Sequence, residues 1–244
     1  MKKIFYNICI LLVTILFYSC EKDHLFDCLK STGSIITESR TVADFSRIDV
    51  YNNVNVILTQ DTENSIEVEA GSHIISGITT EISDGTLTIR NENKCNWVRS
   101  YTSTMAVHVH IKKLDMIQHY GSATISSTNQ LQNTTFDLNV WSSGDINLSV
   151  EAQNTYARQH IAVGDITLSG HSDYAFIYNN GNGFSRDSNF QVDHGTVIQR
   201  ATGDCYVNFT QAMDVEIHET GNVYYTGNPQ ITSSISGSGR LYHQ

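Results

Sequence analysis

Glycine recurs along the C-terminal half of the chain at intervals that leave few folds open. Successive glycines of this series stand roughly 20 residues apart, which is too short for a strand–helix–strand unit. Self-similarity at a nearly constant period of this size is typical of a solenoid, in which each repeat forms one coil and stacks on its neighbours. The series consists of Gly121, Gly144, Gly164, Gly181, Gly203, Gly221 and Gly239.

Side chains around these glycines alternate between apolar and polar, as the period of a β-strand requires. The residues two and four positions after each glycine are mostly apolar, and so is the residue four positions before it. Each repeat therefore predicts a strand, a glycine corner and a second strand. We expect an all-β fold, a right-handed parallel β-helix-like solenoid with about 20 residues per coil. The residues two positions after the glycines are Ala123, Ile146, Ile166, Gly183, Cys205, Val223 and Leu241.

Three polar or reactive residues occupy predicted inward positions. Cys205 stands where other repeats carry an aliphatic residue, so we expect it in the core as a small apolar side chain rather than as a reactive thiol. His160 and Gln199 interrupt the apolar position before the glycine. Either a β-bulge turns Ile161 or Ile198 inward in their place, or the two polar residues are buried and hydrogen-bonded.

An aspartate or asparagine accompanies several of the glycines. Short polar side chains of this kind can bond the backbone of their own turn, which predicts a structural role at the corner. Stacked aspartates could instead bind calcium or act as the paired acids of a polysaccharide-cleaving enzyme. Turn chemistry accounts for all five positions at once, so we expect no metal and no catalytic residue among them. The five residues are Asp145, Asp165, Asn182, Asp204 and Asn222.

Aromatic residues stand near one another in the C-terminal repeats, at intervals of about one coil. Because parallel coils place equivalent residues above one another, we expect an outward aromatic ladder along this face. The ladder could bind sugar rings or a partner protein, or it could stabilise neighbouring coils by cross-strand stacking. The candidate ladder residues are Phe184, Tyr206, Tyr224 and Tyr242.

Sequence motifs for an enzyme or a cofactor site are missing from the chain. His108 and His110 alternate with apolar residues and could share a metal ion, but no third ligand is identifiable nearby. No nucleophile elbow, phosphate-binding glycine loop or Ser/His/Asp arrangement is present in the sequence. We therefore expect neither catalysis nor a cofactor.

The N-terminal segment up to Cys20 has the features of a bacterial lipoprotein signal. A positive segment precedes an apolar run that is too short to span a bilayer, and Cys20 follows a small residue. This predicts a signal peptide over residues 1–19, a lipidated tether over residues 20–30 and the solenoid domain over residues 31–244. A secretory signal without lipid is the alternative. The charged tripeptide after Cys20 resembles an export signal, and a solvated tether is the alternative. We expect an outer-membrane lipoprotein on the periplasmic face or the cell surface.

The net charge limits the classes of molecule that the protein can bind, and the number of cysteines limits its possible disulfide bonds. The formal net charge of −10 disfavours nucleic acid and anionic lipid surfaces, because both require a basic patch. If the signal peptide removes Cys9 and lipid occupies Cys20, three cysteines remain. In an oxidising compartment Cys28 and Cys95 could pair and leave Cys205 free, although the sequence does not determine the connectivity.

Several stretches have the pattern of one protein family. They are TVADFSRIDVYNNVNVILTQ from residue 41, then SIEVEA and EISDGTLTIR, and the closing GNVYYTGNPQITSSISGSGRL. In these motifs the chain resembles the head GIN domain family, exported proteins and lipoproteins described as heads of auto-transporter adhesins. Ser142 and Ala162 depart from the Gly-Ser-Gly corner of the family. The resemblance implies a β-helix-like solenoid from about Thr41 to the C-terminus and no established activity.

Together these features predict a non-enzymatic cell-envelope lipoprotein whose solenoid provides a binding surface for adhesion, with a glycan or a protein as its ligand. One alternative is a structural envelope component that associates through the open end of the solenoid, because parallel coils leave an unpaired edge after Leu241. A polysaccharide-processing enzyme is a third possibility, and it would require a groove lined by two close carboxylates.

Overall fold

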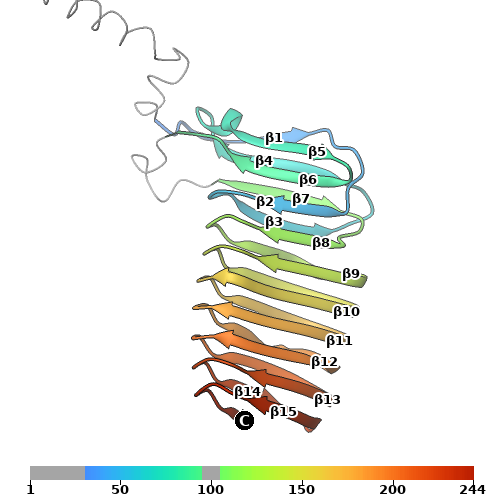
Figure 1. Cartoon of the computed structure of the whole chain (residues 1–244). Coiled ribbons are helices and arrows are strands. Elements are labelled where there is room, and N and C mark those ends of the chain that lie inside the picture. Colours follow the sequence, from blue (N-terminus) through green and yellow to red (C-terminus); the bar gives the residue numbers. More distant parts are fainter. Residues whose placement is uncertain (1–30, 95–104) are drawn as a thin grey trace, which may run out of the picture.

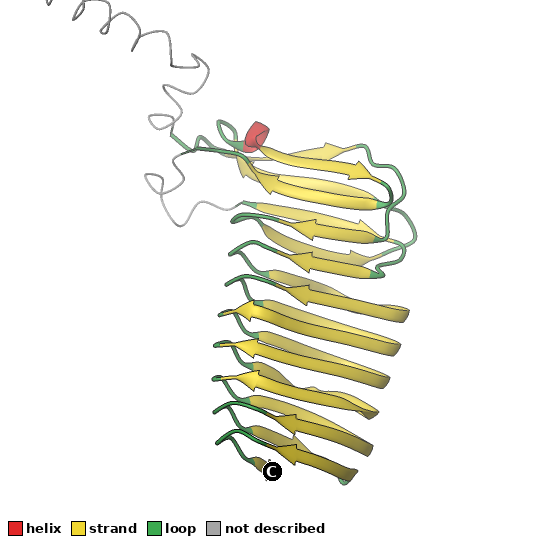
Figure 2. Cartoon of the chain, in the orientation of Figure 1, coloured by secondary structure: helices red, strands yellow, loops and turns green. Residues whose placement is uncertain are grey.

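The computed structural model describes residues 31–94 and 105–244, which form a β-solenoid of about six coils with roughly 20 residues in each (Figure 1). Figure 2 shows that nearly all of this part of the chain is strand or loop, with one short 3₁₀ turn, η3 (Ile75–Gly77). No helix in the described ranges is long and apolar enough to cross a membrane. The all-β solenoid predicted from the glycine repeat is confirmed.

Three predictions concern residues outside the described ranges. They are the lipid on Cys20, the charged tripeptide that follows it, and the pairing of Cys28 with Cys95. The division into residues 1–19 and 20–30 also lies there. All of these stay predictions.

Five long strands build the regular part of the solenoid. Each one leaves a corner, bends once and returns to the next corner, so that a single strand forms both long sides of a coil (Figure 1). Neighbouring strands pair in parallel with equivalent residues in register, for example Ile146 with Ile166 and Ala157 with Ile177. The five strands are β9 (Ile125–Val140), β10 (Ile146–Ala162), β11 (Ile166–Gly181), β12 (Ser185–Ala201) and β13 (Cys205–Ile217). The last coils are formed by β14 (Val223–Thr226), β15 (Gln230–Ile235) and β16 (Leu241–His243).

The N-terminal strands first extend this stack and then close it. Strands β2, β3, β7 and β8 pair in parallel with one another or with β9, whereas β1, β4 and β5 run antiparallel to their neighbours. The turn between β5 and β6 holds Asp84 and Gly85 at φ values of 49° and 72°, as an Asp-Gly hairpin requires. These strands are β1 (Ile35–Arg40), β2 (Arg47–Val50), β3 (Asn55–Gln60), β4 (Ser65–Gly71), β5 (Ile78–Ser83), β6 (Thr86–Asn91), β7 (Ala106–Ile111) and β8 (Met116–His119).

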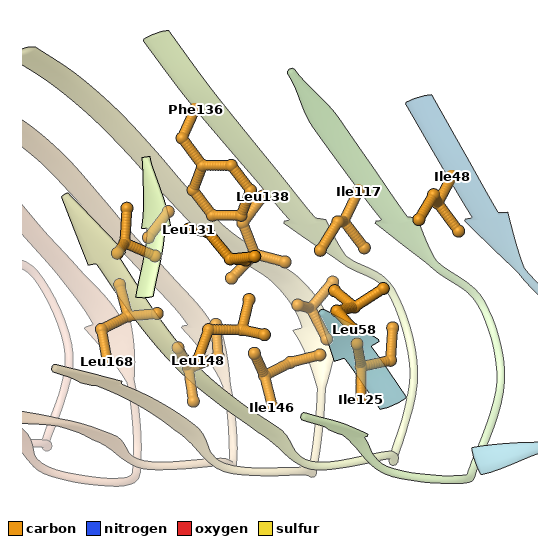
Figure 3. Close-up of a cluster of buried hydrophobic side chains, with 14 of the residues drawn as sticks. Ile48, Leu58, Ile117, Ile125, Leu131, Phe136, Leu138, Ile146, Leu148 and Leu168 are labelled. Atoms are coloured by element: carbon orange, nitrogen blue, oxygen red, sulfur yellow. The ribbon is translucent and has the colours of Figure 1, made fainter. Parts of the chain in front are cut away.

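Each coil has two flat sides that enclose an apolar interior. The leading sheet contains the segments that follow the glycine corner (146–150 in β10), and the trailing sheet contains those that precede the next corner (155–159). Figure 3 shows the side chain of Ile146 from the leading sheet facing Leu138 and Phe136 from the trailing sheet. All three are fully buried, and burial of a side chain of this size contributes about 1.5–3 kcal/mol to folding.

The corner residues form one column, which differs from the predicted one before β9 and before β12. Ala123, rather than the predicted Gly121, lies against Gly144, where a Cβ atom would lie 2.2 Å from the carbonyl oxygen of Ala123. Ser185 lies in register with Cys205, so Gly183 turns the corner and the prediction that Gly181 does so is wrong. A Cβ atom on Gly183 would lie 2.1 Å from the carbonyl oxygen of Gly164. The coils can approach this closely only because the corner carries no side chain.

The inward column after the corner is apolar, with one displacement and one polar member. Ile125, rather than the predicted Ala123, lies in register with Ile146. Ser185 takes the place that was assigned to Gly183. The column consists of Ile125, Ile146, Ile166, Ser185, Cys205, Val223 and Leu241. All of its members are buried except Leu241 in the last coil, which is partly buried.

Coil β12 also places a carboxyl group in the core. Asp187 is fully buried, and its Oδ1 accepts a hydrogen bond of 2.8 Å from the backbone N–H of Leu168. The strands β11 and β12 lose register at this point, so the carboxyl group replaces a missing backbone acceptor. Burial raises the pKa of Asp187 to about 7, although hydrogen bonds from Ser185 and Leu168 oppose the shift. Burial likewise raises the pKa of Cys205, whose predicted position in the core is confirmed.

Near the glycine corner the interior of the trailing sheet is polar. Gln159, Asn179 and Gln199 lie in register on successive coils and are almost completely buried. Nε2 of Gln159 donates to the carbonyl oxygen of Gly164 at 2.5 Å, and Nε2 of Gln199 donates to that of Gly203 at 2.6 Å. The amides therefore satisfy corner carbonyl groups that would otherwise be buried without a partner.

This polar column decides between the two alternatives for His160 and Gln199. Gln199 is buried and hydrogen-bonded, whereas a register shift in β10 turns Gln159 inward in place of His160. Ile161 is 78% exposed and Ile198 is partly exposed. The prediction that either isoleucine points into the core is wrong, because amide groups are needed there to bond the corner.

Candidate functional site

The aspartates and asparagines beside the glycines bind the next coil rather than their own turn. Oδ1 of Asp145 accepts the backbone N–H of Asp165 at 2.9 Å, and Oδ1 of Asp204 accepts that of Asn222 at 2.8 Å. Oδ1 of Asn222 accepts the N–H of Arg240 at 3.0 Å in the same way. The prediction that these side chains bond the backbone of their own turn is therefore wrong. These aspartates belong to no cluster of three metal-ligating groups within the described part of the chain.

Three of the four predicted ladder residues form a stacked column on the leading sheet. The ring centroids of Tyr206 and Tyr224 lie 5.0 Å apart, and those of Tyr224 and Tyr242 lie 5.2 Å apart, with interplanar angles of 10° and 20°. Phe184 is not in line with them, because Arg186 lies in register with Tyr206. The guanidinium carbon of Arg186 instead lies 4.7 Å from the ring centroid of Phe184.

Stacking within this tyrosine column uses the faces of the rings. Nearly parallel rings about 5 Å apart cover the ring faces between them, so both faces of Tyr224 lie against neighbouring rings. Sugar rings bind to aromatic faces, and within this column most of these faces are used for stacking. The geometry therefore favours stabilisation of neighbouring coils by the tyrosine column.

A second aromatic column, not expected from the sequence, runs along the trailing sheet. Its first four rings stack with interplanar angles of 9° to 15°. Trp141 lies 3.7 Å from His160 between ring centroids, and burial lowers the pKa of His160, which favours the neutral imidazole in the stack. The column consists of Tyr51, Tyr120, Trp141, His160 and Tyr178.

Exposed apolar side chains gather at the corner beside this second column. Ile161 and Val163 are 78% and 62% exposed, and Trp141 and Tyr120 are 43% and 38% exposed. The backbone N–H of Val163 donates to the carbonyl oxygen of Ser142, which places Val163 against the coil that carries Trp141. Other corners carry polar residues at the position of Val163. We call these four residues the apolar ridge: Tyr120, Trp141, Ile161 and Val163.

The apolar ridge holds four of the nine exposed large hydrophobic residues in the described ranges. The other five lie at the two ends of the solenoid, namely Ile35 and Ile36 in β1 and Ile231, Ile235 and Tyr242 in the last coils. Within the described ranges, the long sides of the solenoid carry no other large hydrophobic residue that is exposed to this degree. The apolar ridge is therefore the candidate contact surface on the body of the solenoid.

The two histidines considered as metal ligands contact different carboxylates. Nε2 of His108 lies 3.4 Å from Glu69, and Nδ1 of His110 lies 3.1 Å from Asp61. The structure therefore does not bring His108 and His110 together with a shared third ligand within the described residues.

Comparison with known proteins identifies one family that covers most of the chain. Residues 44–229 match the family described as "Putative auto-transporter adhesin, head GIN domain". No curated protein matches the sequence significantly.

Solved structures share the fold at low sequence identity. A "putative adhesin" from Bacteroides fragilis is 21% identical, with a TM-score of 0.80 over 86% of this chain and 97% of that chain. A "putative adhesin" from Parabacteroides distasonis is 19% identical, with a TM-score of 0.68 over 87% and 98%. A "putative lipid binding protein" from the same species is 20% identical, with a TM-score of 0.66 over 88% and 98%. At these identities the likeness concerns the fold alone.

Proposed function

Because this chain belongs to the head GIN domain family, described as a "putative auto-transporter adhesin", we propose that it is a non-enzymatic binding module of the cell envelope that acts in adhesion. The solenoid serves as a rigid support that holds a contact surface away from the membrane. A polysaccharide-processing activity has little support, because the aspartates that could have supplied paired acids bond the backbone of the next coil.

The observation that carries the proposal is the apolar ridge. Exposure of Ile161 and Val163 costs solvation free energy, and neither side chain lies in the buried core of the solenoid. A β-bulge places Ile161 there, and bulges often redirect side chains toward functional surfaces. Exposed apolar side chains that gather on one part of a surface mark interaction sites.

A protein partner fits the apolar ridge better than a glycan does. One face of the Trp141 indole lies against His160, and the other is turned toward Tyr120 at 6.4 Å, so neither face is open to a sugar ring. The accessible groups are ring edges and the aliphatic side chains of Ile161 and Val163. Such groups fit a partner with an apolar centre, and the net charge of −10 favours a basic rim around it.

Adhesion of cells that display the full chain tests this proposal. Adherence is measured on immobilised matrix proteins and on a glycan array for the wild type and for the double variant Ile161→Ser/Val163→Ser. We expect the wild type to adhere to a protein surface and the double variant to lose at least about tenfold, because removal of a hot spot costs about 2 kcal/mol or more. The matched control is Ile35→Ser/Ile36→Ser, which removes two exposed isoleucines from the N-terminal end.

Two outcomes would count against the apolar ridge. Equal adherence of the wild type and the Ile161→Ser/Val163→Ser variant would assign adhesion to another surface. Loss of glycan binding in the triple variant Tyr206→Ala/Tyr224→Ala/Tyr242→Ala, with the ridge variant unaffected, would assign it to the tyrosine column.

Attachment to the envelope forms a separate part of the proposal. Residues 1–19 are removed, and acyl chains on Cys20 hold the protein in the outer membrane, on its periplasmic face or at the cell surface. Cells grown with labelled palmitate should incorporate label into the wild type and none into Cys20→Ala. Label retained by Cys20→Ala would refute lipidation at this residue, whatever the outcome for adhesion.

Association through the C-terminal end is a second candidate role. Strand β15 pairs with β13 and with no other described strand, and all six of its residues are exposed. A free edge that carries exposed isoleucines and no charge can add a further strand. Sedimentation should therefore show self-association that Ile235→Lys abolishes, and a concentration-independent monomer would contradict this role.

A further inference from the structure

A cluster of potential metal ligands lies at the corner opposite the glycine corner. His171 and Asp173 come from β11 and Asp193 comes from β12, and their ligand atoms all lie within 4.8 Å of one another. His171 and Asp173 are two positions apart with buried Ser172 between them, so both side chains point outward. This site is separate from the apolar ridge and from both aromatic columns.

The imidazole of His171 is oriented by a carboxylate from the preceding coil. Nδ1 of His171 lies 3.3 Å from Oε1 of Glu151, whose other oxygen accepts a hydrogen bond of 3.2 Å from Gln130. With the proton on Nδ1, the lone pair of Nε2 is directed to the other side, where Oδ1 of Asp193 lies 3.7 Å away. A carboxylate that fixes the tautomer of a histidine ligand is the usual outer shell of a protein metal site.

The two aspartates face each other across neighbouring strands. Ser172 pairs with Val192 and Tyr174 pairs with His194, so Asp173 and Asp193 are opposite one another in register. Like charges in this position are destabilising unless a cation lies between them. Oδ1 of Asp193 also accepts a hydrogen bond of 2.9 Å from Thr210, which holds this carboxylate in place.

We propose that His171, Asp173 and Asp193 bind one divalent transition-metal ion, with Glu151 as the positioning residue for His171. One imidazole nitrogen and two carboxylate oxygens suit Zn²⁺ or Mn²⁺, whereas Ca²⁺ prefers oxygen ligands alone. Bonds of about 2.0–2.2 Å place two ligands of one ion roughly 3–4 Å apart, which small rotations of these side chains achieve. The bound ion joins β11 to β12 and keeps its remaining positions open to solvent.

Zn²⁺ titration of the full chain, purified in detergent and stripped of metal with a chelator, tests the site by calorimetry. The wild type should bind one more Zn²⁺ ion per chain with high affinity than either His171→Ala or Asp193→Asn. Glu151→Gln should keep the stoichiometry and weaken binding by about 10- to 100-fold, because it removes only the positioning carboxylate. The matched control is His110→Ala, which breaks an exposed histidine–carboxylate pair elsewhere and should leave the titration unchanged.

Circular dichroism of the metal-free variants separates loss of the site from loss of the fold. A folded His171→Ala variant that binds as many equivalents as the wild type, with the same affinity, overturns the proposal. Absence of any tight equivalent in the wild type also overturns it, since the site needs no partner. Mn²⁺ provides a second readout, because its electron paramagnetic resonance spectrum broadens on binding to the wild type and should not change with folded Asp193→Asn.

Discussion

Replacement of Asp187 by asparagine should make the protein more stable at neutral pH. An asparagine side chain mimics the protonated carboxyl group: its Oδ1 accepts the N–H of Leu168, and its Nδ2 donates to the hydroxyl of Ser185. The introduced amide cannot ionise, so the variant preserves the contacts of the buried site and removes only its titration.

The magnitude follows from the pKa of Asp187, which burial raises from 3.8 in the unfolded chain to about 7 in the folded protein. Between these two values the unfolded chain loses its proton and the folded protein retains it, so the free energy of unfolding falls as the pH rises. At about 1.4 kcal/mol per pH unit the loss is about 1–2 kcal/mol at pH 5 and about 4 kcal/mol above pH 7. Below pH 4 the carboxyl group is protonated in both states and the penalty disappears.

Urea unfolding monitored by circular dichroism at pH 4, 5.5, 7 and 8 provides the measurement. The stability advantage of Asp187→Asn over the wild type should be small at pH 4 and grow by about 4 kcal/mol up to pH 8. Exposed Asp214 supplies the control, because Asp214→Asn makes the same substitution at the surface and leaves the core unchanged. A stability difference for Asp187→Asn that does not change with pH would refute the view that Asp187 is held protonated in the core.

Three further predictions test the stacking of the coils. Gly203→Ala would place a Cβ atom 2.3 Å from the carbonyl oxygen of Gly183, and we expect a loss of about 1–3 kcal/mol or more in urea unfolding; unchanged stability would mean that the corners are not in contact. Asp204→Ala removes the acceptor for the N–H of Asn222 and should cost about 1–3 kcal/mol by the same assay, whereas no loss would show that this bond does not hold the coils together. The thiol of Cys205 should resist a thiol reagent in the native protein and react in urea, because it is fully buried. Fast reaction of the native protein at this residue would contradict its place in the core.

The glycine repeat was sufficient to predict the solenoid, because a short, nearly constant period with alternating apolar residues admits few other folds. It was not sufficient to fix the register. In the stretch "GNG" both Gly181 and Gly183 fit a corner, and only pairing of Ser185 with Cys205 selects the second. If Gly181 is taken as the corner, Asp187 is not one of the two positions after the corner that should point inward. Its burial could therefore not be predicted from the sequence.

The candidate surfaces were harder to predict, because they depend on contacts between coils. Tyr120, Trp141 and His160 recur at intervals of about one coil, which is a signal for the second aromatic column, but the column stands before the corner rather than after it. His160 marked the position of a bulge in the sequence, but the sequence did not determine that the bulge would turn Ile161 outward. The pairing of His171 with Glu151 across coils likewise requires the register of β10 and β11.

Function in a solenoid is best sought where one coil departs from the others at a cost to stability. Asp187 departs from the apolar pattern, but it compensates by bonding a backbone N–H that has lost its partner. The exposed side chains of Ile161 and Val163 have no such compensation within the fold, and neither does the opposition of Asp173 and Asp193. A contact with a partner accounts for the first pair, and a bound cation accounts for the second. Because the two sites share no residue, mutations in them should act independently. The variant Ile161→Ser/Val163→Ser should lose adhesion and still bind the metal ion. The variants His171→Ala and Asp193→Asn should lose the metal ion and still adhere. Loss of adhesion on metal removal alone would show instead that the ion supports the contact surface.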